Sequence, residues 1–204
     1  RGEAPLWEIP RIDACYDDAW TDPVRALWTI RAPWQEFAEN GPDFVHLRTV
    51  HGSSDAPELE SYELDGWLTH LRSRVNFATP RGPQPGRIDT DAWGPGLSLA
   101  RFSGILDACF VGAITPLDFE ETLVSFNYMV KKLGSSAEAL ERTRRVGEAL
   151  IADLRRQVAE DVVIFDHKVW NPRPALSRAD GPIAKFREWA GQFYVEGDPR
   201  AVNR

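Results

Sequence analysis

The sequence has little of what would make it a disulfide-rich, membrane-spanning or nucleic-acid-binding protein. Its 204 residues include two cysteines, Cys15 and Cys109, which are too few for a disulfide framework. No apolar run approaches the ~20 residues that a membrane-spanning helix needs, and no signal-peptide pattern is present. The net charge of −7, without a basic patch, argues against binding to nucleic acid or an anionic membrane. We therefore expect a cytoplasmic protein with reduced thiols.

Methionine is also scarce, because Met129 is the only one and the chain begins with Arg1. A natural initiator is therefore absent, and we expect the chain to be a piece or a processed form of a longer protein. With 43% hydrophobic residues, the chain is long enough to build one domain with a substantial core.

The most informative stretch, residues 39–52, has the pattern Asn-x2-Asp-x2-His-x4-His-Gly, formed by Asn40, Asp43, His46, His51 and Gly52. If Pro42 opens a helix, Asp43 and His46 lie three residues apart on one face and can hydrogen-bond. His51 lies about 140° around an ideal helix from His46. Both imidazoles therefore reach one point only if the helix is distorted or ends there. The alternative is two ordinary histidines on an amphipathic helix.

A second carboxylate lies late in the chain, on a predicted long helix. Residues 135–138 have the form of a capping box, and an apolar stripe follows, formed by Leu140, Val146, Leu150, Ile151, Leu154 and Val158. Asp161 continues this stripe and so faces the core, whereas Glu160 falls on the solvent side. A buried carboxylate needs an arginine, backbone donors or a metal. Two histidines and one carboxylate form the ligand set that leaves positions open for dioxygen at non-haem iron.

The pattern at residues 40–52 resembles the mononuclear iron motif of the Rieske-type non-haem iron oxygenases. Residues 160–168 are similar to the family's late Glu-Asp signature. Residues 171–176, 180–183 and 186–194 resemble the tail of one branch, which contains the bacterial 3-ketosteroid 9α-hydroxylase oxygenase components and the cholesterol 7-desaturases. The resemblance extends from Ile12 to Tyr194.

This resemblance implies that His46, His51 and Asp161 bind Fe(II). Asp43 would orient His46 and pass electrons from a [2Fe-2S] cluster on the next subunit of a head-to-tail homotrimer. Asn40 would lie beside this path, or it caps the helix. The implied reaction uses O2 to hydroxylate or desaturate a hydrophobic ring substrate, at branch level a steroid or sterol. Electrons would come from NAD(P)H through a reductase, with or without a ferredoxin.

A Rieske cluster needs two cysteines and two histidines, and neither Cys15 nor Cys109 has a histidine at the family's spacing. The resemblance therefore implies that the N-terminal Rieske domain is absent from this chain and that the chain alone does not turn over. We expect an extended segment at residues 1–20, the catalytic domain at 21–194 and a tail at 195–204.

Alternating apolar residues predict strands at 60–77, 97–102, 105–114 and 122–133. Residues Pro33–Phe37 are expected to form a short helix. Residues 78–96 are expected to form turns or a loop. The order of elements predicts an α+β domain. The resemblance implies a helix-grip (START/Bet v 1-like) fold, in which a curved antiparallel sheet wraps a long C-terminal helix around an apolar cavity. Candidates to line this cavity, or to pack the core, are Trp67, Trp93, Phe102, Phe110, Phe126 and Tyr128.

Two other functions remain open. A START-like hydrophobic-ligand carrier with a vestigial motif would bind no metal. A zinc hydrolase would use the same three residues, because three ligands and a water also describe catalytic zinc; against it, Asp43 lacks a general-base geometry so close to a ligand. Of the remaining histidines, His70 is expected at the surface or the pocket edge, and His167 in a structural role.

Overall fold

The fold combines a single antiparallel sheet with one long helix. A computed structural model describes residues 7–53, 56–79, 82–177, 180–195 and 198. The strands are β1 (Val24–Ile30), β2 (Glu58–Asp65), β3 (Leu68–Phe77), β4 (Gln84–Trp93), β5 (Leu97–Ser103), β6 (Ala108–Pro116) and β7 (Thr122–Val130). The helices are α1 (Trp34–Ala38), α2 (Val45–Thr49), α3 (Ala137–Phe165) and α4 (Ile183–Ala190), with 3-10 turns η1 (Asp13–Cys15) and η3 (Gly191–Phe193).

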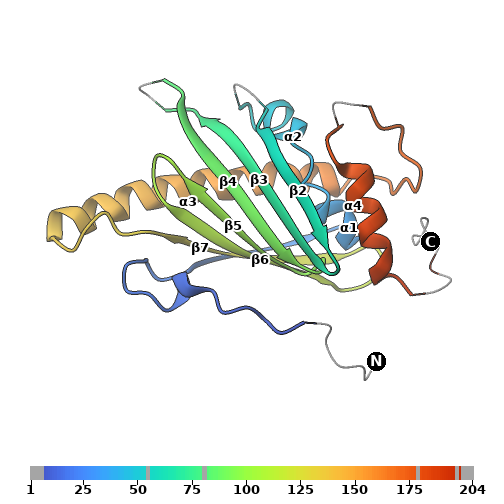
Figure 1. Cartoon of the computed structure of the whole chain (residues 1–204), viewed down its shortest axis with the longest axis horizontal. Helices are drawn as coiled ribbons and strands as arrows, with labels where there is room; N and C mark the ends of the chain where they lie inside the picture. Colours follow the sequence, from blue (N-terminus) through green and yellow to red (C-terminus); the bar gives the residue numbers. More distant parts are fainter. Residues whose placement is uncertain (1–6, 54–55, 80–81, 178–179, 196–197, 199–204) are drawn as a thin grey trace.

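Strands β2 to β7 form a meander, and β1 is added at the edge by pairing with β7. Its seven strands follow the order β1-β7-β6-β5-β4-β3-β2, and every neighbouring pair is antiparallel. β2 and β3 are joined by a turn at Gly66, whose φ of 55° favours glycine. Because successive side chains point to opposite faces of a strand, the sheet has an inner face toward α3 and an outer face away from it (Figure 1).

The long helix α3 packs along the inner face (Figure 1). The side chain of Ser136 accepts a hydrogen bond from the backbone N–H of Ala139, so the cap lies one residue after the start of the predicted box. The stripe is confirmed in its second half but not in its first, where Leu140 is 42% and Val146 is 41% exposed. In this half the buried residues of α3 are instead Thr143 and Gly147, and Figure 1 shows that the first turns of the helix extend beyond the sheet.

Two strands escaped the sequence prediction. Residues 78–96 do not form only turns, because β4 lies there and pairs with β3 and β5 along its length. Its start contains Pro85 and Gly86, which in the sequence resemble a turn. β1 was not recognised as a strand, although it pairs with β7 and buries Ala26 and Ile30. The short helix expected at Pro33–Phe37 is confirmed as α1.

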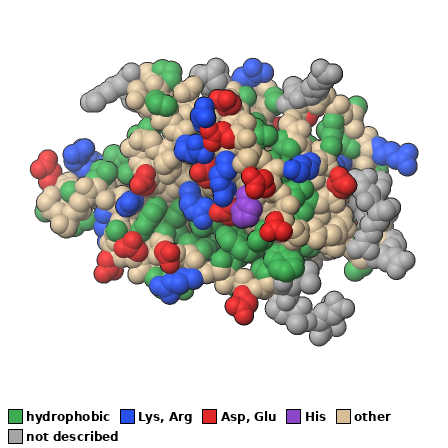
Figure 2. All heavy atoms as spheres, in the orientation of Figure 1, with side chains coloured by type: hydrophobic (Ala, Val, Ile, Leu, Met, Phe, Trp, Pro, Cys, Tyr) green, Lys and Arg blue, Asp and Glu red, His purple; other side chains and the backbone are tan. Residues whose placement is uncertain are grey.

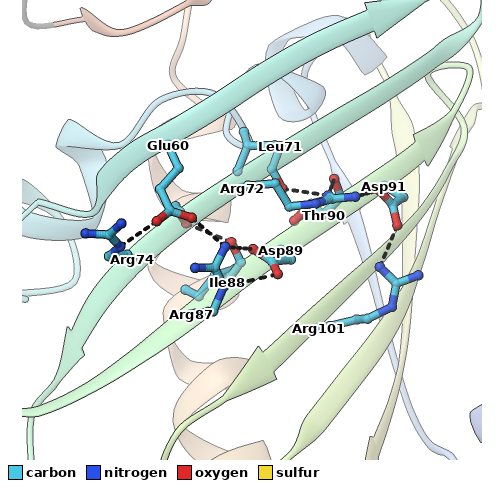
Figure 3. A network of polar contacts seen from close by, with 11 residues as sticks. Glu60, Leu71, Arg72, Arg74, Arg87, Ile88, Asp89, Thr90, Asp91 and Arg101 are labelled. Atoms are coloured by element: carbon cyan, nitrogen blue, oxygen red, sulfur yellow. Dashed lines mark hydrogen bonds and ion pairs between the residues drawn. The ribbon is translucent and has the colours of Figure 1, made fainter.

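The outer face carries a network of charged side chains. Figure 2 shows basic and acidic groups gathered over the middle of the sheet, and Figure 3 shows part of their network. Asp91 accepts hydrogen bonds from His70 Nδ1 at 2.7 Å, Arg72 at 2.6 Å and Arg101 at 2.5 Å. Burial raises the pKa of Asp91, but these three hydrogen bonds outweigh it and hold the pKa at about 2. His70 is therefore part of the polar network on the outer face.

The chain ends are only partly described. Residues 7–20 of the predicted extended segment contain η1 and reach a bridge between Trp20 and Lys131. Residues 1–6 and most of the predicted tail at 195–204 lie outside the described residues, so the boundaries at 20 and 195 remain predictions. None of the described helices is both long and apolar enough to span a membrane.

Candidate metal centre

The first two candidate ligands lie on and just after α2, a helix of five residues that begins at Val45. The carboxylate of Asp43 accepts hydrogen bonds from the backbone N–H groups of Val45 at 3.1 Å and His46 at 3.3 Å. The helix ends at Thr49, so His51 lies outside it, next to Gly52 with a φ of 70°. This early end lets the two imidazoles meet, with ring centroids 5.2 Å apart.

The third candidate approaches from α3. His46, His51 and Asp161 each offer one ligand atom, and these atoms lie within 4.8 Å of one another. The distance from His51 Nε2 to Asp161 Oδ1 is 3.2 Å, and Asp161 is only 6% exposed. Three residues that the sequence nominated separately thus converge on one point.

Hydrogen bonds hold both imidazoles with the same nitrogen free. His46 donates from Nδ1 to the backbone carbonyl of Asp43, and His51 Nδ1 lies 3.0 Å from Glu160 Oε2. Each Nε2 is therefore the nitrogen left for a metal. The expected hydrogen bond from the His46 ring to the Asp43 carboxylate is not formed, because His46 Nδ1 bonds the backbone carbonyl of Asp43 instead.

Two contacts at the site were not expected from the sequence. Glu160 was assigned to solvent, yet one carboxylate oxygen contacts His51 and the other pairs with Arg156. Asn40 does not cap α2; its side-chain amide donates to Asp161 Oδ2 at 2.7 Å. The i,i+4 spacing of Arg156 and Glu160 predicts an ion pair on the helix surface. No local feature of the sequence indicates that His51 contacts Glu160.

The electrostatics of the site favour a cation. Burial raises the pKa of Asp161, against the opposing effects of His51, His46 and Asn40. Burial likewise lowers the pKa of His46, against its hydrogen bond to Asp43 and the nearby carboxylates. A neutral imidazole with a free lone pair is the form that binds metal, and a buried carboxylate is stabilised by a cation. The donor set fits a non-haem iron(II) site and also accepts zinc.

The site opens onto a cavity of about 260 Å³ between the inner face of the sheet and α3. His46, His51 and Asp161 form part of its wall. The predicted aromatic residues that also line it are Phe102, Phe110, Phe126 and Tyr128. The cavity is therefore mostly apolar, with the three candidate ligands among its polar groups.

The other two predicted aromatic residues, Trp67 and Trp93, do not line this cavity. Trp93 follows Ala92, whose side chain lines the cavity, so strand alternation turns Trp93 to the outer face. There it packs against a cluster that contains Met129. Trp67 lies in the turn after Gly66 and is 39% exposed.

Helix α4 contributes Phe186 and Trp189 to the cavity wall, and a buried ion pair connects it to Glu39, the residue after α1. Arg187 lies 2.7 Å and 2.9 Å from the two carboxylate oxygens of Glu39. Burial raises the pKa of Glu39, and the hydrogen bond from Arg187 opposes it. Because Glu39 precedes Asn40, the ion pair also fixes the backbone next to the group that contacts Asp161.

Relatives of the chain share this part of their sequence. The family model described as 3-Ketosteroid 9alpha-hydroxylase C-terminal domain matches residues 1–194. A cholesterol 7-desaturase of Ciona intestinalis is 26% identical over 226 residues, covering 98% of this chain and 46% of the relative. The oxygenase component of a 3-ketosteroid-9-alpha-monooxygenase of Rhodococcus rhodochrous is 26% identical over 209 residues, covering 94% and 53%. The chain thus spans about half the length of these relatives.

Solved structures have the same fold. The structure of Pseudomonas putida NdmA with caffeine has a TM-score of 0.67 and 17% identity, covering 90% of this chain and 54% of that one. Dicamba monooxygenase bound to dicamba has a TM-score of 0.60 and 14% identity, covering 93% and 63%. The predicted α+β fold is thereby confirmed. Since the family model matches almost the whole chain, the chain belongs to the 3-ketosteroid 9α-hydroxylase C-terminal domain family, the catalytic domains of Rieske oxygenases.

Proposed function

We propose that this chain binds Fe(II) through His46, His51 and Asp161 and uses O2 to hydroxylate or desaturate a hydrophobic ring substrate. The observation that carries the proposal is the convergence of the three ligand atoms within 4.8 Å at the wall of an apolar cavity. The names of the relatives, a cholesterol desaturase and a ketosteroid monooxygenase, support a steroid-like or sterol-like substrate.

The residues that surround the proposed iron site would have different roles. Iron(II), when bound, supplies the activation of O2. The hydrogen bonds from His51 to Glu160 and from His46 to the Asp43 carbonyl would leave each Nε2 free to bind the metal. The apolar wall excludes water and orients the ring of the substrate.

Electrons must come from outside the 204 residues. We infer a [2Fe-2S] cluster on a neighbouring subunit of a homotrimer, supplied by NAD(P)H through a reductase, with or without a ferredoxin. Asp43 is the candidate bridge for these electrons, because it is partly exposed and its carboxylate accepts a hydrogen bond from the backbone N–H of His46. Asn40, bonded to Asp161, would hold that ligand in place during the reaction.

Metal content tests this proposal directly. Protein purified without oxygen should contain about one iron per chain by mass spectrometry. The variants His51→Ala and Asp161→Ala should lose most of it, because each removes a ligand. His167→Ala is the matched control, since His167 is exposed and bonds the carbonyl of Val163 on α3. Equal metal in all four proteins would refute the assignment, and circular dichroism should establish that the variants remain folded.

A ligand carrier is the second candidate, favoured by the cavity itself. Wild-type protein that contains no metal yet binds steroids would support it. A zinc hydrolase has less support, because such an enzyme needs a free general base. The nearby carboxylates of Asp43 and Glu160 are engaged by backbone N–H groups and by His51 and Arg156.

A further inference from the structure

One polar group in the cavity wall has no partner. Tyr128 on β7 lines the cavity and is only 2% exposed. Among the described residues, no donor or acceptor bonds its buried hydroxyl group. Buried hydroxyl groups are normally hydrogen-bonded, and an unpaired one destabilises the folded state.

The surroundings of this hydroxyl are apolar. The ring of Tyr128 lies 5.6 Å from that of Phe110 and 6.0 Å from that of Phe126. It shares a core cluster with Ile151 of α3. Burial raises the pKa of Tyr128, so the phenol stays protonated at neutral pH and keeps a hydrogen to donate.

Tyr128 and the candidate metal ligands border different parts of the same cavity. Val130, two residues along β7 on the same face, packs against Gly147, since a Cβ there would lie 2.9 Å from its Cγ2. Asp161 follows Gly147 by 14 residues, about 21 Å along the helix axis. Tyr128 therefore faces the middle of α3 and not the Asp161 end.

We propose that the hydroxyl of Tyr128 donates a hydrogen bond to a carbonyl oxygen of an otherwise apolar ring ligand whose reacting carbon lies near His46, His51 and Asp161. The inference rests on the proposed function, because it assumes that the substrate occupies this cavity. It adds a ligand requirement: one acceptor oxygen, distant from the carbon that reacts. A site built around such a hydrogen bond discriminates against ligands that lack the acceptor.

Ligand binding to the isolated chain tests this requirement without any need for metal or turnover. The probes are two tetracyclic steroids that each contain a single ketone, one at each end of the ring system. For each steroid, the matched analogue has a methylene group in place of the ketone oxygen. Quenching of tryptophan fluorescence reports binding, since Trp189 lines the cavity. Tyr128→Phe removes only the hydroxyl, and Tyr16→Phe makes the same change at an exposed position.

We expect the wild type and Tyr16→Phe to bind one ketone about tenfold more tightly than its analogue, as one hydrogen bond implies. Tyr128→Phe should lose this preference and bind the analogue at least as well as the wild type does. A preference that survives in Tyr128→Phe, or an equal loss of affinity for all probes, would overturn the inference. Failure of the wild type to bind any probe would also overturn the inference. It would not affect the iron assignment, which depends on the metal measurement alone.

Thermal melting without ligand supplies an independent check. Because Tyr128→Phe removes an unpaired buried hydroxyl, its melting temperature should equal or exceed that of the wild type. A lower melting temperature would mean that the hydroxyl already has a partner in the free protein, and the inference would fail.

Discussion

At the scale of single residues, the metal centre depends on atoms that are not themselves ligands. Glu160 and Asn40 each contact one candidate ligand, His51 and Asp161, from outside the triad. Partners of this kind set the tautomer and orientation of the ligands. Arg156 in turn pairs with Glu160, so the orientation of His51 is linked to the surface of α3.

We expect Glu160→Gln to weaken metal binding about tenfold, because an amide oxygen is a poorer acceptor than a carboxylate for the His51 N–H group. The measurement is a titration with Fe(II) or Co(II) in competition with a chelator. Glu148→Gln is the control, since Glu148 makes the same i,i+4 contact with an arginine, Arg144, far from the site. An unchanged affinity in Glu160→Gln would mean that its contact with His51 does not orient the ligand.

At the scale of the elements, the start of β4 shows how a turn-like sequence forms a strand. A Cβ at Gly86 would lie 2.4 Å from the Ser103 carbonyl oxygen and 2.4 Å from the Phe77 ring. Glycine is therefore required because β3 and β5 both approach closely at this position. The residue that argued for a loop is the one that permits the strand.

Gly86→Ala should accordingly lower the free energy of unfolding by about 2 kcal/mol, the typical cost of overpacking. Gly191→Ala is the matched control, because nothing lies within 4 Å of its Cβ and its φ is −53°. Urea denaturation measures both. If the two variants are equally stable, the close approach of β3 and β5 at Gly86 does not constrain the sheet.

The charged network on the outer face links β3, β4 and β5 through Asp91. Its folded-state pKa of about 2 lies below the ordinary value of 3.8, so its contribution is present above pH 4 and is lost as the pH falls toward 2. We expect Asp91→Asn to destabilise the protein by about 1–2 kcal/mol at pH 7.

Denaturation over a range of pH measures this effect, with Asp13→Asn as the control because that side chain is 89% exposed. The difference between wild type and Asp91→Asn should shrink as the solution is acidified from pH 4. A difference that stays constant down to pH 2.5 would contradict the role of the ionised carboxylate.

At the scale of the whole molecule, the chain belongs to a family of catalytic domains, and we do not expect it to be a complete enzyme. The chain has two cysteines, neither spaced with a histidine as a Rieske cluster requires. With iron, NADH and an active reductase, we expect less than one product per chain. Reduction of cytochrome c by the same reductase is the control for electron supply, and repeated turnover by this chain alone would refute the prediction.

The local features of the fold were predictable from the sequence. The spacing of Asn40, Asp43, His46 and His51 nominated one half of the site, and the periodicity of α3 put Asp161 on the buried side. The hairpin at Gly66 follows from the preference of glycine for positive φ. Each of these features depends on residues within a few turns or one hairpin, where spacing alone sets which side chains share a face.

The tertiary structure alone decided the rest. It brought Glu160 to His51 and Asn40 to Asp161, and it turned Trp93 away from the cavity. It also left the hydroxyl of Tyr128 unpaired within the cavity wall. These outcomes depend on how a curved sheet and a long helix pack together, and so join residues far apart in the chain. Local spacing contains no information about such contacts, because they are set by which faces the core buries.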